Sequence, residues 1–137
     1  MAQRRFHQFP TVRACMTPAP LTIGRAQSLA TARKLMREHH VRHLPVLDGG
    51  VVAGLLSERD LLLVEALDTT NPEQVRAEEA MATDVFTAGP DDPLAPVVEN
   101  MVERKLGSVV VVENEHVVGV VTTTDALRLL VEILAER

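Results

Sequence analysis

The sequence predicts a mixed α/β (α+β) fold built from two β-α-β-β-α repeats. The main observation is that GLLSERD at residues 54–60 recurs as GVVTTTD at residues 119–125, a shift of 65 positions (119 − 54 = 65). Composition is a second observation, because 46% of the residues are hydrophobic and only 2% are aromatic, which predicts an aliphatic core. The same shift, without a gap, aligns Met16 with Met81, Thr22 with Thr87, Leu29 with Leu94, Met36 with Met101, and Val46 with Val111. A period kept this strictly indicates two copies of one structural unit.

The first repeat, residues 12–67, carries a start or stop signal for each element. Pro18 and Pro20 predict a turn before the first extended segment. Ser28 and Ser57 are good N-caps for two helices, and Asp-Gly-Gly at residues 48–50 is typical of a hairpin turn. The predicted elements are, in order, an extended segment at 21–23, a helix from 28 to 39 or 40, strands at 41–47 and 51–56, and a helix from 57 to about 67.

The second repeat, residues 81–137, shows the same order. Asp92 is expected to cap a helix with Pro93 as its first residue, and Thr122 or Thr123 is expected to open the terminal helix. The predicted elements are an extended segment at 86–87, the helix from 93, strands at 109–112 and 117–121, and the helix from 122 or 123 onward.

Two segments fall outside the repeats. Residues 1–11 are expected to form an N-terminal extension, and residues 68–80 a linker with a short amphipathic helix over 73–81. Because one three-stranded repeat leaves an apolar sheet face uncovered, we expect the two repeats to pack sheet to sheet around a pseudo-twofold axis, as one module.

Composition and charge restrict the class of protein. The formal net charge of −5 argues against nucleic-acid binding, which needs a basic face. Cys15 is the only cysteine, so there is no intrachain disulfide, and a reducing compartment is favoured. No apolar run is long enough to span a membrane, and no apolar segment typical of a signal peptide follows Arg4 and Arg5. We therefore expect a cytoplasmic protein without membrane insertion. Basic residues are nevertheless dense in one stretch: Arg33, Lys34, Arg37, His39, His40, Arg42 and His43.

The repeated heptapeptide has the chemistry of a nucleoside phosphate site. Its glycine permits close approach of a ligand or a second backbone, and its Ser or Thr lies at a helix N-terminus, which favours an anion. The Asp three residues later faces the same way, and a carboxylate suits the two hydroxyl groups of a ribose. The same Ser/Thr–Asp pair is also an ordinary helix-capping arrangement, and that alternative stays open.

These segments resemble the cystathionine-β-synthase (CBS) domain pair, also called a Bateman module. The resemblance covers residues 12–130, and its motifs are VRHLPV at 41–46, DGG at 48–50, VAGLLSERDL at 52–61, GSVVVV at 107–112 and VGVVTTTD at 118–125, with openings MTP at 16–18 and MAT at 81–83. It implies an adenosine-containing ligand held in clefts built from both repeats. In the family the Asp binds ribose and the Ser/Thr binds phosphate, and two chains form a flat homodimer through their helices.

The resemblance implies two ligand clefts of unequal quality. Arg42 and His43 are expected to neutralise phosphate in the first cleft, so tighter binding is expected there. Arg59 is expected to compensate in part in the second. The first cleft comprises Thr17, Thr22, Arg42, His43, Leu44, Pro45, Thr122, Thr124 and Asp125. The second cleft comprises Ser57, Arg59, Asp60, Thr87, Gly107, Ser108 and Val109.

The expected function is that of a stand-alone regulatory CBS pair which binds AMP, ADP or ATP and signals to an unidentified protein partner in trans. Two alternatives stay open: a ligand-free structural or interaction module, and binding of S-adenosylmethionine, NAD or a cyclic dinucleotide in the same cleft. No nucleophile–base constellation is present, so we expect no enzyme activity and no obligatory cofactor. His39 and His43 flank a helix end without further ligands, so no metal site is expected.

Overall fold

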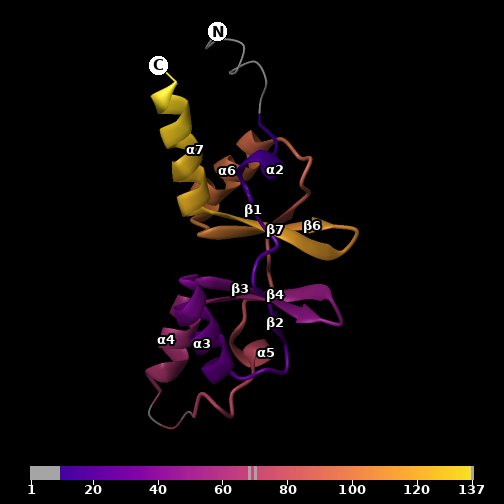
Figure 1. The fold of residues 1–137 in the computed structure, drawn as a ribbon. Helices are drawn as coiled ribbons and strands as arrows, with labels where there is room; N and C mark the ends of the chain where they lie inside the picture. The colour runs from indigo at the N-terminus through magenta and orange to yellow at the C-terminus, as the bar shows by residue number, and fades with distance from the viewer. Residues whose placement is uncertain (1–9, 68, 70, 137) are drawn as a thin grey trace. The chain divides into compact units, whose positions relative to one another are not determined.

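The computed structural model describes residues 10–67, 69 and 71–136, which form two compact units (Figure 1). The first-repeat unit comprises residues 21–85, and the second-repeat unit comprises residues 10–20 together with 86–136. Each unit combines a sheet with helices, which confirms the mixed α+β class. Of the predicted N-terminal extension, residues 1–9 lie outside the described part of the chain.

The first-repeat unit contains a β2-β3-β4 sheet, in which β2 runs parallel to β3 and β3 antiparallel to β4. Its elements are β2 (Ile23–Gly24), α3 (Leu29–His39), β3 (His43–Asp48), β4 (Val51–Ser57), α4 (Glu58–Glu65) and α5 (Ala77–Ala80). The Ser28 hydroxyl accepts a hydrogen bond from the Thr31 N–H at 3.1 Å, which confirms the predicted cap of α3. The two residues between β3 and β4, Gly49 and Gly50, have φ of 60° and 88°, as the predicted hairpin turn requires.

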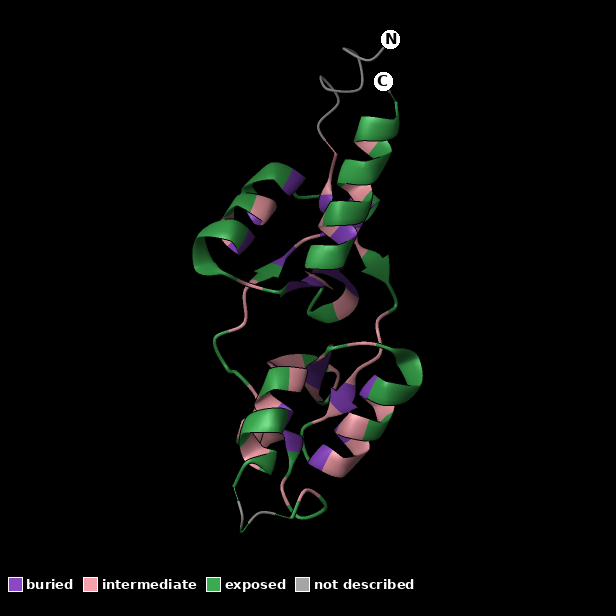
Figure 2. Ribbon diagram, turned by 90° about the vertical axis from the view of Figure 1, so that its left-hand side faces the viewer, coloured by how far each residue is buried: buried purple, intermediate pink, exposed green. Residues whose placement is uncertain are grey.

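The second-repeat unit contains a β5-β6-β7-β1 sheet with the same parallel and antiparallel pairings. Its elements are α2 (Val12–Cys15), β1 (Thr17–Pro18), β5 (Thr87–Ala88), α6 (Leu94–Arg104), β6 (Ser108–Glu113), β7 (His116–Thr122) and α7 (Thr123–Ala135). Figure 2 shows that α7 is exposed along most of its length, and Asp125 is its one buried residue among those described.

Two helix predictions need correction, and one helix was missed. The linker helix covers only Ala77–Ala80 rather than 73–81. The N-cap of α6 is Pro93 and not Asp92, because the Asp92 carboxylate instead accepts a hydrogen bond from the Gly89 N–H at 2.7 Å. The short helix α2 was not predicted, since four residues are too few for a periodic pattern.

The two cores occupy equivalent positions 65 residues apart. Leu29, Met36, Leu44 and Leu56 are buried in the first-repeat unit, and their equivalents Leu94, Met101, Val109 and Val121 are buried in the second. The aliphatic core that the composition predicts is therefore present in both.

The opening segments, however, lie in exchanged positions. Val12 belongs to the core of the second-repeat unit, and its equivalent Ala77 belongs to the core of the first. Met16 correspondingly packs on Gly119 and Met81 on Gly54, so that a Cβ at either glycine would overlap a thioether. Each heptapeptide is thus covered by the segment that opens the other repeat.

Candidate functional site

Each heptapeptide forms a strand-to-helix junction with a complete capping box. At the first junction, which comprises Ser57 and Asp60, the Ser57 hydroxyl accepts from the Asp60 N–H at 3.1 Å, and the Asp60 carboxylate accepts from the Ser57 N–H at 2.8 Å. At the second junction, Thr122 and Asp125 repeat these bonds at 3.1 and 2.9 Å. The capping interpretation is therefore correct for both copies, and a ligand has to use the acceptor capacity that capping leaves free.

Other predicted residues lie beside each junction, at the start of the neighbouring strand, which is β3 in the first-repeat unit and β6 in the second. His43 pairs with Ser57 in the β3–β4 ladder, and the Glu58 N–H donates to the Arg42 carbonyl at 2.8 Å. Arg42 and His43 therefore lie next to the first junction. In the second-repeat unit, Ser108 pairs with Thr122, and the Thr123 N–H donates to the Gly107 carbonyl at 3.1 Å.

The remaining predicted residues differ in exposure. Leu44, Pro45 and Val109 are fully buried, so they belong to the cores and present no exposed surface. Arg59 and Thr124 are exposed in the first turns of α4 and α7. Thr22 is half-buried in the first-repeat unit, and Thr87 is exposed on β5. The pairing of residues from both repeats in one cleft stays a prediction.

The cationic group at the first junction is Arg42. Burial lowers the pKa of His43 below its ordinary value, and Arg42 lowers it further, against the opposing effects of Asp60 and Glu58. His43 is therefore neutral at neutral pH and offers a hydrogen bond rather than a charge. Arg42 is exposed, and a guanidinium is a planar cation that can donate two parallel hydrogen bonds to phosphate.

The second junction holds a buried hydroxyl without a partner. Ser108 is 5% exposed, and its Oγ has no hydrogen-bond partner among the described residues. Such a group is costly to bury unless a ligand or water satisfies it.

Arg128 is the site residue that our sequence analysis missed. Its Nη1 donates to Asp125 Oδ1 at 3.0 Å, and the Thr17 hydroxyl donates to the same oxygen at 2.9 Å. The spacing of three residues between Asp125 and Arg128 was a usable helical signal.

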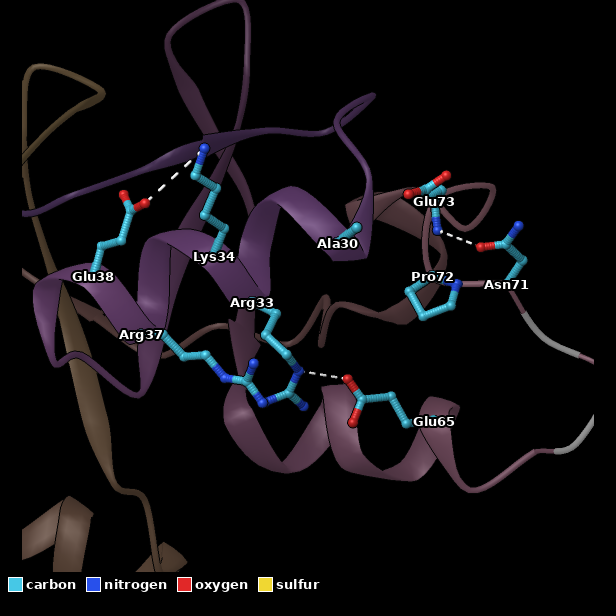
Figure 3. Close-up of a pocket in the computed structure, with 9 residues that line it drawn as sticks. All are labelled: Ala30, Arg33, Lys34, Arg37, Glu38, Glu65, Asn71, Pro72 and Glu73. Carbon is cyan, nitrogen blue, oxygen red and sulfur yellow. Dashed lines mark hydrogen bonds and ion pairs between the residues drawn. The ribbon is translucent and has the colours of Figure 1, made fainter.

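The basic stretch of the first repeat contributes to a separate pocket of about 540 Å³ (Figure 3). Arg33 pairs with Glu65 and Lys34 with Glu38, and none of the predicted cleft residues lines the pocket. Its lining residues are Ala30, Arg33, Lys34, Arg37, Glu38, Glu65, Asn71, Pro72 and Glu73. Three cations facing three carboxylates give this pocket no preference for an anion.

The described residues were also compared with what a metal site, a reactive thiol and a membrane-spanning helix require. Within residues 10–67, 69 and 71–136, no three His, Cys, Asp or Glu side chains are grouped so that they could hold a metal ion. Cys15 is buried, and burial raises the pKa of its thiol, which makes it a poor nucleophile. None of the described helices has the length and apolar character needed to cross a membrane.

Comparison with protein families decides the classification. The family model described as CBS domain matches twice, at residues 12–66 and 77–132. The chain belongs to the CBS domain family. The CBS domain-containing protein YhcV of Bacillus subtilis is 29% identical over 118 residues, a match that covers 84% of this chain and 81% of YhcV. The chain also matches larger enzymes, but it spans only 12% to 25% of their length.

Solved structures of CBS pairs share the fold. A Vibrio cholerae protein assigned to acetoin utilization (AcuB) superposes with a TM-score of 0.84 at 29% identity, and the match covers 93% of this chain and 94% of that one. The CBS domain pair of protein MJ0100, in complex with 5′-methylthioadenosine and S-adenosylmethionine, has a TM-score of 0.79 at 28% identity, with 90% and 98% covered. This chain is therefore a tandem CBS pair.

Proposed function

We propose that this CBS pair is a regulatory module, not an enzyme, that binds an adenosine-containing small molecule at its strand-to-helix junctions. The observation that carries the proposal is the first junction. There a half-buried carboxylate, Asp60, caps the helix N-terminus at Ser57, and the backbone of the exposed Arg42 is hydrogen-bonded to the first residue of that helix. A carboxylate accepts ribose hydroxyl groups, and a cation beside a helix N-terminus suits phosphate.

The comparison with MJ0100 supports the adenosine part of the proposal. That CBS pair is 28% identical to this chain with a TM-score of 0.79, and both of its ligands contain adenosine. S-adenosylmethionine and 5′-methylthioadenosine carry no phosphate. The affinities of AMP, ADP and ATP are therefore compared with the affinities of these two ligands, NAD and a cyclic dinucleotide.

Calorimetric titration with this set of ligands tests the proposal. We expect saturable binding of at least one adenosine-containing ligand with a Kd of micromolar order, and no binding of guanosine monophosphate. No heat and no thermal stabilisation with any of them at about 1 mM would overturn it and favour a ligand-free interaction module.

We propose further that the module acts as a homodimer in the cytoplasm and signals in trans to a partner protein. Support comes from α7, which exposes a row of apolar side chains: Leu127, Leu130, Val131 and Leu134. Exposed aliphatic residues at helical spacing are typical of an interface between helices. Light scattering should give twice the chain mass, and Leu130→Glu should reduce it to one chain mass; a monomeric wild type would contradict the dimer.

A further inference from the structure

The two junctions differ in the acceptor capacity of their carboxylates. A carboxylate offers about four lone-pair sites. Asp125 uses all of them, since Oδ2 accepts from the N–H and the hydroxyl of Thr122, both at 2.9 Å, and Oδ1 accepts from Thr17 and Arg128 at 2.9 and 3.0 Å. Asp125 is also only 4% exposed. It has no acceptor site left for a ribose.

Asp60 keeps one carboxylate oxygen free. Its Oδ2 accepts from the N–H and the hydroxyl of Ser57 at 2.8 and 2.9 Å, as the capping box requires. Its Oδ1 receives no hydrogen bond from any residue that the structure describes, and the side chain is half-buried rather than buried. Two lone-pair sites on Oδ1 are therefore available to two vicinal hydroxyl groups.

Two substitutions between the repeats explain the difference. The shift of 65 places Ala82 at the position of Thr17 (17 + 65 = 82) and Leu63 at the position of Arg128 (128 − 65 = 63). The backbone pairing confirms the first equivalence, because Thr17 pairs with Val120 as Ala82 pairs with Leu55 (120 − 55 = 65). Neither Ala82 nor Leu63 has a side-chain donor, so nothing at these positions occupies Asp60.

We infer that Asp60 is the ribose acceptor of this CBS pair, and that Thr17 and Arg128 close the equivalent position at Asp125. This rests on the proposed function and refines it: the pair binds one ligand per chain through the first junction. It also reverses the expectation that the cleft containing Asp125 binds more tightly. Thr17 and Arg128 act as specificity-determining residues because their hydrogen bonds occupy Asp125 Oδ1, which a ribose hydroxyl would otherwise use.

Calorimetry with AMP and 5′-methylthioadenosine tests the inference, because both carry the 2′,3′-diol, and 2′-deoxy-AMP lacks one of its hydroxyls. We expect one site per chain, a loss of at least about tenfold in affinity in Asp60→Asn, and less than about a twofold change in Asp125→Asn. Removal of the 2′-hydroxyl should weaken binding to the wild type and have little effect in Asp60→Asn. Two equivalent sites, or a loss confined to Asp125→Asn, would overturn the inference but leave the proposed function intact.

Reciprocal variants keep the test decisive if Asp125→Asn fails to fold. Thr17→Ala/Arg128→Leu gives the second junction the residues of the first, and we expect a second binding event. Ala82→Thr/Leu63→Arg gives the first junction the residues of the second, and we expect binding to fall at least about tenfold. Unchanged stoichiometry in the former together with unchanged affinity in the latter would refute the role of these positions. If the wild type binds no adenosine ligand at all, the proposed function itself fails.

Discussion

The bond between Thr17 and Asp125 makes a quantitative prediction about stability. The Thr17 hydroxyl donates to a carboxylate that is 4% exposed, at 2.9 Å and across 108 positions of sequence. A hydrogen bond to a charged, buried acceptor contributes about 1.5–3 kcal/mol. Because Thr17 itself is exposed, water can partly replace its hydroxyl, so Thr17→Ala should cost about 1.5 kcal/mol, near the lower end of that range.

The assay is urea unfolding followed by circular dichroism, with thermal unfolding in parallel. For a chain of this length a loss of about 1.5 kcal/mol corresponds to a fall in Tm of about 6 °C. Thr17→Ser keeps the donor and is the matched control, which should lose less than about 0.5 kcal/mol. Equal losses in the Ser and Ala variants would mean that the methyl group, not the hydroxyl, stabilises this contact, and would refute the reasoning. A loss below about 0.3 kcal/mol in Thr17→Ala would refute it as well.

Three further perturbations have expected outcomes. Burial lowers the pKa of His43, so the unfolded chain takes up a proton at a higher pH than the folded one. The wild type should therefore lose more stability than His43→Gln when the pH falls from about 7.5 to about 5.5. Urea titration measures this difference, and equal losses would contradict the prediction. Gly54→Ala should cost about 1–3 kcal/mol, and more than Gly119→Ala. A Cβ at Gly54 would lie 2.7 Å from the Ala82 carbonyl oxygen, whereas a Cβ at Gly119 would lie 3.1 Å from the nearest backbone atom. A larger loss for Gly119→Ala in thermal unfolding would be inconsistent with this geometry. Glu65→Gln should cost about 1–3 kcal/mol, since it replaces the carboxylate that pairs with Arg33, a side chain only 19% exposed, by a neutral amide. Its control, Glu38→Gln, acts on the exposed pair of Glu38 and Lys34 at 4.0 Å and should cost less than about 0.5 kcal/mol in the same urea assay.

The repeat made most of the fold predictable. A gapless shift of 65 residues aligned Leu29 with Leu94 and Met36 with Met101, and all four are core residues. The caps at Ser28, Ser57 and Thr122 followed from local chemistry, since the N-cap bond joins residues three positions apart. One error arose where a nearby alternative competed, at Asp92, whose carboxylate binds the Gly89 N–H instead of capping α6.

The exchange of the opening segments was not predictable from the sequence. Met16 and Met81 are identical, as are Gly54 and Gly119, so each methionine has the same complementarity to either glycine. A choice between identical partners depends on chain connectivity and on packing over many residues, which a local pattern does not record.

The exchange is also the reason why the two junctions differ chemically. Because the segment containing Thr17 lies against β7, a residue that belongs to the first repeat by sequence sets the acceptor capacity of Asp125 in the second. At the first junction the equivalent position is Ala82, which belongs to the opening segment of the second repeat and has no side-chain donor for Asp60. A comparison of the two heptapeptides alone would rate Asp60 and Asp125 as equal, since both sit three residues after a capping hydroxyl. The difference between them lies at positions 17 and 82. In a repeat pair with exchanged segments, the ligand chemistry of one repeat therefore depends on the opening segment of the other.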